Sequence, residues 1–334
     1  MRLTLLTRWY VYGPVAIILL GLVLLRARPV QTLSTLSESD WRPLALAIAL
    51  NGVVIGLWVV RSGQLLRHHG HRIPAGPLAL LVTFANTASS LTPASTGEIA
   101  RVVLLERRHG VPLGTGTAVV LVERFMALYL MAITTGLAWV WLLVGHPAAG
   151  GVGLAIVVAA LAFAPTIAYR AGLRPLDAIG RRLERSPADG RRRRVGHQLV
   201  EVDARIAATV ADARRSGVFI VASLAIFALF AAQFALAAAA IGEDLDLATA
   251  WAIQGVAIVV GVLSAIPFGL GVSDAAIALL LPTLSVDPAS AALIALLFRA
   301  VSTLPVTLLG IGSYVLLARG GPTDRTAGAD AGPS

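Results

Sequence analysis

Six stretches of this sequence are apolar enough to cross a lipid bilayer as α-helices. A helix needs about 20 largely apolar residues to span the hydrocarbon core of a membrane. The stretches that we interpret as spans are residues 10–25, 43–60, 117–144, 150–168, 217–242 and 289–317. They predict an all-α integral membrane protein with about six full transmembrane helices.

The composition supports this class and excludes others. Of the 334 residues, 57% are hydrophobic and 13% are charged, whereas about 25% of a typical soluble domain is charged. So little charge excludes an ordinary cytosolic enzyme and a disordered protein. The chain has no cysteine, which excludes a disulfide scaffold and Cys-ligated metals. The six histidines show no ligand spacing, so we expect neither a metal nor another cofactor.

The basic residues set the orientation of the spans. All 27 of them are arginine, the net charge is +9, and 12 lie in one polar loop, residues 169–216. This placement between apolar spans argues against a nucleic-acid partner, because Arg-rich loops of membrane proteins stay on the cytoplasmic side. We therefore predict a cell-membrane protein whose N- and C-termini are cytoplasmic. The connections 146–151 and 243–246 contain no Arg and are predicted to lie outside.

Two further apolar regions are interrupted and do not read as simple spans. Residues 77–92 lead into a short second helix that ends near 106, and residues 247–266 lead into one that ends near 281. The breaks are marked by Pro93 and Gly97 in the first region and by Pro267, Gly269 and Gly271 in the second. Broken backbone at membrane depth is tolerated only where it faces protein or a wet cavity. We therefore expect two re-entrant helical hairpins.

The two hairpins belong to an internal repeat. A shift of 174 residues places Ser90, Pro93 and Gly97 on Ser264, Pro267 and Gly271. Repeat A covers about 43–144 and repeat B about 217–318, and the charges of the loops give them opposite orientations. This is the inverted-topology repeat of many secondary transporters. Residues 1–318 then form one polytopic membrane domain, and residues 319–334 form a flexible tail.

Few ionisable residues fall at membrane depth, and they are candidate substrate-binding residues. They are Glu98, Arg101, Glu123, Arg124, Asp274 and Arg299. A charge at the bilayer centre is costly and marks function. Guanidinium groups hold phosphate through two hydrogen bonds, and helix N-termini after the two breaks attract anions. The breaks also supply glycines, which let a backbone or a headgroup approach closely. Together these features suit an anionic lipid headgroup.

A purely structural role for the same residues is the alternative. Glu98 and Asp274 fall in first helical turns, where an acid stabilises the dipole, and each could pair with the Arg that follows in its repeat. Ser95, Thr96 and Ser273 are candidate N-caps. For Glu123 we expect pairing, and for Arg101 an anchoring role on headgroups is as consistent with its position as a transport role.

The motifs resemble those of a known family. Thr92-Pro93-Ala94-Ser95-Thr96-Gly97-Glu98-Ile99-Ala100-Arg101 is similar to its P-x-x-x-G-E-x-x-R motif, and Val122-Glu123-Arg124 to its E-R motif. Ile266-Pro267-Phe268-Gly269-Leu270-Gly271-Val272-Ser273-Asp274 resembles its P-G-G-L-G-x-x-E motif, and Phe298-Arg299 its final-span Arg. The family is the flippase-like transmembrane domain of lysylphosphatidylglycerol synthases and its stand-alone relatives. Two departures are Phe268 in place of Gly and Asp274 in place of Glu.

The resemblance implies translocation of an anionic lipid or a lipid-linked sugar between leaflets. Only about 16 residues follow the last span, so we expect no synthase domain and no enzyme activity. The expected partners are the bilayer and a lipid with an anionic headgroup. The alternative is a non-transporting membrane protein that presents lipid to a separate glycosyltransferase or lipid synthase.

Two amphipathic helices are predicted in the loop 169–216. Apolar residues recur every three or four positions at Leu173, Leu176, Ile179 and Leu183, and again at Leu199, Val202, Ile206 and Val210. Arg residues occupy many positions between them. Such helices are typical of segments that lie on an anionic membrane surface, and a solvated loop is the alternative.

Overall fold

The structure is a computed structural model that describes Ile18, Gly21 and residues 40–92, 97–144, 150–185, 190–210, 212–264 and 266–319. The predicted span at 10–25, the residues Pro93, Ser95 and Thr96, and the tail after Arg319 lie outside the described residues and stay predictions.

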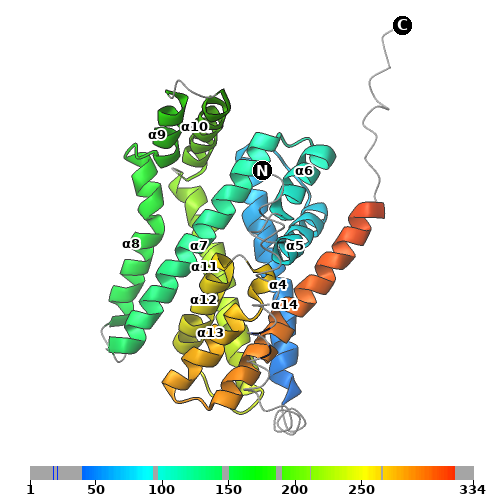
Figure 1. Cartoon of the computed structure of the whole chain (residues 1–334), viewed down its shortest axis with the longest axis vertical. Helices are drawn as coiled ribbons and strands as arrows, with labels where there is room; N and C mark the ends of the chain where they lie inside the picture. Colours follow the sequence, from blue (N-terminus) through cyan, green and yellow to red (C-terminus); the bar gives the residue numbers. More distant parts are fainter. Residues whose placement is uncertain are drawn as a thin grey trace.

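The described part of the chain is helical and contains no strand (Figure 1). The helices of the first half are α4 (Trp41–His68), α5 (Ala75–Leu91), α6 (Gly97–His109), α7 (Leu113–Val144) and α8 (Gly150–Arg170). Two helices fill the predicted loop, α9 (Pro175–Glu184) and α10 (Gly190–Val210). The second half contains α11 (Ala213–Ala239), α12 (Leu247–Leu263), η2 (Pro267–Gly269), α13 (Val272–Leu280), η3 (Leu281–Leu284) and α14 (Pro288–Arg319).

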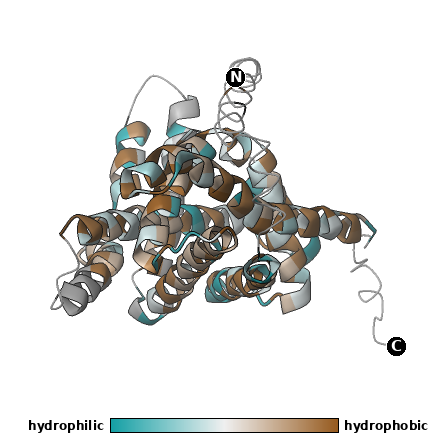
Figure 2. Ribbon diagram, turned by 90° about the horizontal axis from the view of Figure 1, so that it is seen from below, coloured by the Kyte–Doolittle hydropathy of each residue, from teal (hydrophilic) through white to brown (hydrophobic). Residues whose placement is uncertain are grey.

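The chain is a multi-pass membrane protein. Five helical stretches in the described ranges are long and apolar enough to cross a membrane: Trp41–His68, Leu113–Val144, Ser216–Ala239, Pro267–Leu284 and Pro288–Arg319. Large apolar side chains such as Leu143, Leu308 and Leu316 are exposed, and Figure 2 shows hydrophobic residues on the outer helices of the bundle. An apolar outer surface of this extent needs lipid around it, because it would aggregate in water.

Short polar caps fix where several helices begin at one end of the bundle. Asp40 accepts a hydrogen bond from the backbone of Arg42 at the start of α4, and Asp246 accepts from Ala248 and Thr249 at the start of α12. Asp287 caps α14 in the same way. Each carboxylate satisfies amides that a helix leaves unpaired in its first turn.

The two halves of the bundle make matching contacts. The helices α4, α5, α6 and α7 of the first half correspond in order to α11, α12, α13 and α14 of the second half. Helices that contact each other in one half have corresponding helices that contact each other in the other half. Within the halves, α4–α5, α5–α6 and α6–α7 correspond to α11–α12, α12–α13 and α13–α14. Between the halves, α5–α14 and α4–α14 correspond to α12–α7 and α11–α7, and α4 contacts α11. This is the contact pattern that an internal repeat produces.

The two broken regions are helical hairpins that open at opposite ends of the bundle. Figure 1 shows α5 and α6 in the upper half of the molecule, on the side of α9 and α10, and α12 and α13 in the lower half. Two contacts agree with this arrangement. At one end, the Arg108 side chain near the end of α6 donates to the carbonyl of Leu317 near the end of α14. At the other end, the Asp40 amide at the start of α4 donates to the carbonyl of Ala240 after α11 (3.1 Å). We refer to the side of α9 and α10 as the α9–α10 end.

Both amphipathic helices predicted in the loop are present as α9 and α10. They pack closely on each other at two glycines, because a Cβ at Gly180 would lie 2.7 Å from the carbonyl oxygen of Gly196. Asp203 is buried at their junction and accepts hydrogen bonds from the Tyr169 hydroxyl (3.2 Å) and the Leu176 amide (3.1 Å). Of the predicted apolar face, Leu173 and Ile179 stay exposed, and contact with a membrane surface stays a prediction.

A glycine on α14 tests the packing between the halves. A Cβ at Gly310 would lie 2.5 Å from the Cβ of Thr87 and 3.0 Å from the backbone oxygen of Thr83, both on α5. We expect Gly310→Ala to lower the melting temperature, because α5 and α14 must move apart. The matched control is Gly312→Ala two residues away, where no atom lies within 4 Å. There the better helix propensity of Ala should raise stability by about 0.8 kcal/mol. Equal melting temperatures for the two variants would contradict the close contact.

Candidate functional site

A cavity of about 910 Å³ lies between the two halves. Its walls come from both hairpins and from α4, α7, α11 and α14, and most of the lining side chains are apolar. The charged lining residues are Arg61, Glu98, Arg101, Glu123, Arg124, Asp274 and Arg299. The structure thus brings all six predicted charged residues to one cavity and adds a seventh, Arg61, which lies just beyond the predicted span 43–60.

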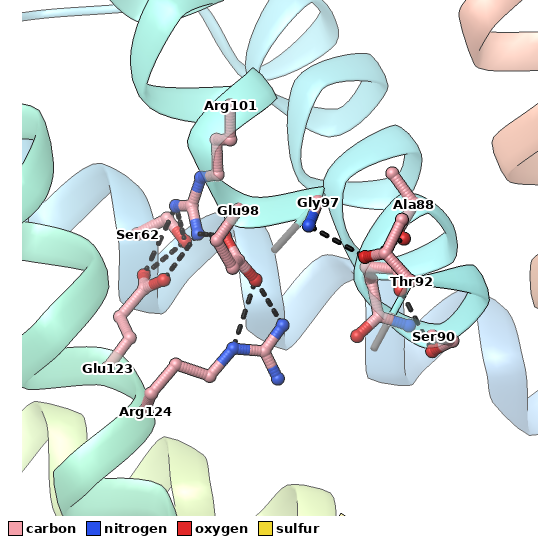
Figure 3. Close-up of polar contacts among 10 residues, drawn as sticks. Ser62, Ala88, Ser90, Thr92, Gly97, Glu98, Arg101, Glu123 and Arg124 are labelled. Carbon is pink, nitrogen blue, oxygen red and sulfur yellow. Dashed lines mark hydrogen bonds and ion pairs between the residues drawn. The ribbon is translucent and has the colours of Figure 1, made fainter. Parts of the chain in front are cut away.

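Glu123 and Arg101 form a buried ion pair on the wall formed by α6 and α7 (Figure 3). Arg101 Nη1 donates to Glu123 Oε2 at 2.5 Å, and Arg101 Nη2 donates to the Ser62 hydroxyl at 2.8 Å. The Ser62 hydroxyl in turn donates to Glu123 Oε1. Arg101 is only 3% exposed. The pairing expected for Glu123 is confirmed, and Arg101 is its partner.

Glu98 and Arg124 form a second, more accessible pair (Figure 3). Arg124 donates to Glu98 Oε1 through Nε at 3.0 Å and also through Nη2. The other oxygen, Oε2, lies 3.7 Å from Arg101 Nη1 and has no hydrogen-bond partner among the described residues. The Glu98 side chain is 9% exposed, but that of Arg124 is 46% exposed. Arg124 can therefore contact a ligand in the cavity while it stays paired.

The start of α6 is held by the end of α5. Thr92 Oγ1 accepts a hydrogen bond from the Gly97 amide at 2.8 Å and donates to the carbonyl of Ala88 at 2.8 Å (Figure 3). A Cβ at Gly97 would lie 2.2 Å from the Ala88 carbonyl carbon and 2.3 Å from the Ser89 nitrogen. Gly97 is thus needed for the close approach of two backbones, as the sequence suggested. The Thr92 cap was missed because it lies before the proline, where no helix start was expected.

Asp274 and Arg299 form the corresponding pair in the second half, with a different geometry. Asp274 accepts from Arg299 Nε at 2.9 Å and Nη2 at 2.8 Å, and also from the Gly271 amide at 2.9 Å. Arg299 Nη1 donates to the carbonyl of Phe268 at 3.2 Å. Each of the three Arg299 nitrogens therefore donates to the protein, and the side chain is only 18% exposed. This pair ties the turn of the second hairpin to α14.

The prediction of Ser273 as an N-cap is wrong. The N-cap of α13 is Gly271, whose amide is bound by Asp274 three residues later. Ser273 instead packs against glycines, since a Cβ at Gly261 would lie 2.2 Å from its hydroxyl oxygen. Gly269 and Gly271 have φ values of 58° and 76°, which glycine adopts without steric cost. These two glycines and Pro267 shape the turn and do not line the cavity.

Phe268 has a positive φ of 56°, which is unusual for a residue other than glycine. It lies in the turn of the second hairpin, lines the cavity and offers its carbonyl to Arg299. A left-handed backbone costs a non-glycine residue about 1–2 kcal/mol, so the surrounding contacts must hold it in place.

Arg61 is a cavity residue that the sequence analysis missed. Its predicted span ended at residue 60, but α4 continues to His68. Arg61 Nη1 donates to the Ser223 hydroxyl at 3.4 Å, and its guanidinium carbon lies 5.2 Å from the centre of the Phe219 ring. Its Nε is buried with no hydrogen-bond partner in the described part of the chain. Ser62 and Leu65, which follow Arg61, are buried. Leu65 continues the apolar helical spacing beyond residue 60, and this spacing was the sequence signal that α4 extends past Arg61.

The cavity offers chemistry for an anion but no site for a metal. Its carboxylates are each bound to an Arg, and within the described ranges no group of three or more His, Cys, Asp or Glu residues could hold a metal ion.

The sequence matches the family model of the lysylphosphatidylglycerol synthase transmembrane region over residues 11–310. The chain belongs to this family.

A curated relative is the glycosyltransferase AglD of Haloferax volcanii. It is 32% identical over 135 residues, which is 40% of this chain and 21% of AglD. This chain therefore spans only a small part of the length of that relative. The likeness supports family membership, and the activity named for AglD remains a statement about AglD.

Phe268 is a departure from the glycine of the family motif, and it gives a test of backbone strain. Phe268→Gly and Phe268→Ala both remove the ring, but only Ala keeps a Cβ at φ 56°. We expect the Gly variant to be more stable than the Ala variant by about 1 kcal/mol, measured as thermal unfolding in detergent. The control is Leu308 within α14, where Gly should be less stable than Ala by about 1 kcal/mol. The same order at both positions would refute the strain at Phe268.

Proposed function

We propose that this protein moves an anionic, phosphate-bearing lipid or lipid-linked sugar between the leaflets of the cytoplasmic membrane. The observation that carries the proposal is the cavity between the halves, because it places four Arg residues and only three carboxylates among mostly apolar lining residues. Guanidinium groups bind phosphate with planar, paired hydrogen bonds. The apolar walls suit the acyl chains of the same molecule.

Arg124 is the proposed ligand contact, and Arg299 holds the second hairpin. Arg124 Nη1 has no recorded hydrogen bond to the described residues, and nearly half of the side chain is exposed. Glu98 positions it, and Asp274 positions Arg299. Arg101 and Glu123 neutralise each other in the buried ion pair on the wall formed by α6 and α7.

The membrane arrangement that we propose is an inverted-topology repeat with α5–α6 and α12–α13 as re-entrant hairpins. The matching helix contacts of the two halves and the opposite directions of the hairpins support it. Six full spans would include the predicted helix at 10–25. In this arrangement the α9–α10 end and both termini are cytoplasmic.

The orientation can be tested with single cysteines, since the natural chain has none. We expect a cysteine at His71 or Gly190 to be protected from an impermeant thiol reagent in whole cells, because both lie towards the α9–α10 end. A cysteine at Asp244, in the connection before α12, should be labelled. Asp244 is preferred to Asp246, which caps α12. Labelling at Gly190 in intact cells would refute the proposed orientation.

The transport function is tested with purified protein in liposomes that carry fluorescent phosphatidylglycerol in both leaflets. A membrane-impermeant quencher bleaches only the labelled lipid in the outer leaflet. Transfer between leaflets therefore appears as loss of more fluorescence than the outer leaflet alone contributes. We expect faster bleaching than in protein-free liposomes. The same rate as in protein-free liposomes, from protein with a cooperative unfolding transition, would refute transport.

The Lys variants separate ligand contact from structural pairing. Arg124→Lys keeps the charge but loses the planar fork, so we expect about tenfold slower transfer, the effect of about 1.4 kcal/mol, with an unchanged melting temperature. Arg299→Lys cannot serve both Asp274 oxygens and the Phe268 carbonyl, so we expect a lower melting temperature. Full transfer by Arg124→Lys would remove the reason for placing the phosphate at Arg124.

The name of the relative favours a second candidate function. AglD is a glycosyltransferase, and a protein of this family could present a lipid substrate to such an enzyme without moving it between leaflets. We propose that this chain is not itself an enzyme, because its cavity carboxylates are all engaged by Arg. A presenting protein would bind anionic lipid in detergent and leave the transfer rate of liposomes unchanged.

A further inference from the structure

We propose that the half of the cavity near the α9–α10 end contains a second anion subsite, centred on Arg61, which the phosphate group of the ligand occupies in addition to its contact position at Arg124. The inference deepens the proposed function and rests on it only in taking the phosphate to belong to a lipid.

The cavity has one more cation than it has anions. Its lining includes four Arg residues and three carboxylates in the described part of the chain. Each carboxylate is paired with a different Arg, namely Glu123 with Arg101, Glu98 with Arg124, and Asp274 with Arg299. Arg61 is the remaining cation, and no carboxylate of the described residues lies within 4 Å of it.

The contacts of Arg61 leave much of its binding capacity unused. A guanidinium group has five N–H donors. The described partners are one long hydrogen bond to Ser223 (3.4 Å) and the face of the Phe219 ring. The Nε atom is buried and has no partner. A buried donor without a partner is costly, so a ligand that accepts from Nε and from a terminal nitrogen would be favoured.

The nearest acid cannot fill this role. Glu123 Oε2 accepts from Arg101, and Oε1 accepts from Ser62 and Arg101. Transfer of Glu123 to Arg61 would leave the buried Arg101, which is 3% exposed, to share Glu98 with Arg124, since Glu98 Oε2 lies 3.7 Å from Arg101 Nη1. Arg61, Arg101 and Glu123 therefore carry one excess positive charge whichever Arg binds Glu123, and only an added anion neutralises it.

The second half of the protein has no equivalent cluster. A shift of 174 residues places Arg61, Ser62 and Arg101 on Ala235, Leu236 and Ala275. The excess charge is thus confined to one half of a symmetric frame. Arg61 lies seven residues before the end of α4, or about 10 Å along a helix, which places the subsite towards the α9–α10 end.

The experiment measures binding to the purified full-length chain in a nonionic detergent. The probes are short-chain phosphatidylglycerol, short-chain phosphatidylcholine and inorganic phosphate, each followed by calorimetry and by the shift of the melting temperature. We expect phosphatidylglycerol to bind and Arg61→Gln to weaken it at least tenfold. Arg61→Lys should recover part of the affinity. Arg67→Gln is the matched control, because it removes the same charge from an exposed position of α4, and it should change affinity less than twofold.

A second readout distinguishes binding from a structural role. Without ligand, Arg61→Gln should melt at the same temperature as the natural protein or higher, because the change removes an unpaired buried charge. A lower melting temperature together with unchanged phosphatidylglycerol affinity would show a structural Arg and overturn the proposal. Unchanged affinity with unchanged stability would also overturn it. Equal binding of inorganic phosphate and phosphatidylglycerol, both lost in Arg61→Gln, would support the anion subsite and assign it to free phosphate.

Transfer in liposomes, measured on the same preparations, separates this inference from the proposed function. Arg61-dependent binding without transfer between leaflets would support the subsite and refute transport. Transfer that is normal in Arg61→Gln, with normal lipid affinity, would refute the subsite and leave the proposed function intact.

Discussion

The rest of the structure depends on the pairing of Arg with carboxylates inside an apolar bundle. A lone charge at this depth would be expelled or would draw water in. Here each pair joins a hairpin to the long helix that follows it, with Glu98 on α6 bound to Arg124 on α7, and Asp274 on α13 bound to Arg299 on α14. The pairs therefore do two things at once. They make charged residues tolerable in the membrane, and they fix α6 and α13, whose residues Glu98 and Asp274 line the cavity.

The two halves share a frame but differ in how firmly each pair is closed. Asp274 accepts from both Arg299 and the Gly271 amide, so it caps α13 and binds Arg299 together. Glu98 meets Arg124 through one oxygen only, while the Gly97 amide at the start of its helix donates to Thr92. The first half thus keeps an accessible guanidinium beside the cavity, and the second half uses its guanidinium to hold a strained turn at Phe268. Symmetry of the helices does not require symmetry of function.

Much of the fold could be predicted from the sequence because apolar length and Pro/Gly breaks are local signals. Four of the five described spans, the order helix, break, helix, and the two loop helices follow from them. The fifth described span, Pro267–Leu284, was predicted as part of a hairpin, and the predicted span 150–168 is present as the helix α8. Contacts between distant segments could not be predicted in this way. Arg61 follows the predicted span 43–60 directly and was taken for the start of the loop after it. Its partner Ser223 lies 162 positions away. Ser273 was expected to cap α13, but the left-handed turn at Gly271 moved the cap to that residue.

The same pairing that stabilises the empty cavity is also suited to ligand exchange under the proposed function. A phosphate that approaches Arg124 meets a cation already held in position by Glu98, so little rotamer entropy is lost on binding. The Nη1 group can donate to the phosphate without release of the carboxylate, and the charge that the phosphate brings is balanced by the excess cation at Arg61 rather than by a broken ion pair. No ion pair has to break when the headgroup binds. An apolar bundle that holds one unpaired cation beside its ion pairs can therefore take in a charged headgroup without exposing a carboxylate, and Arg61 is that cation among the described residues.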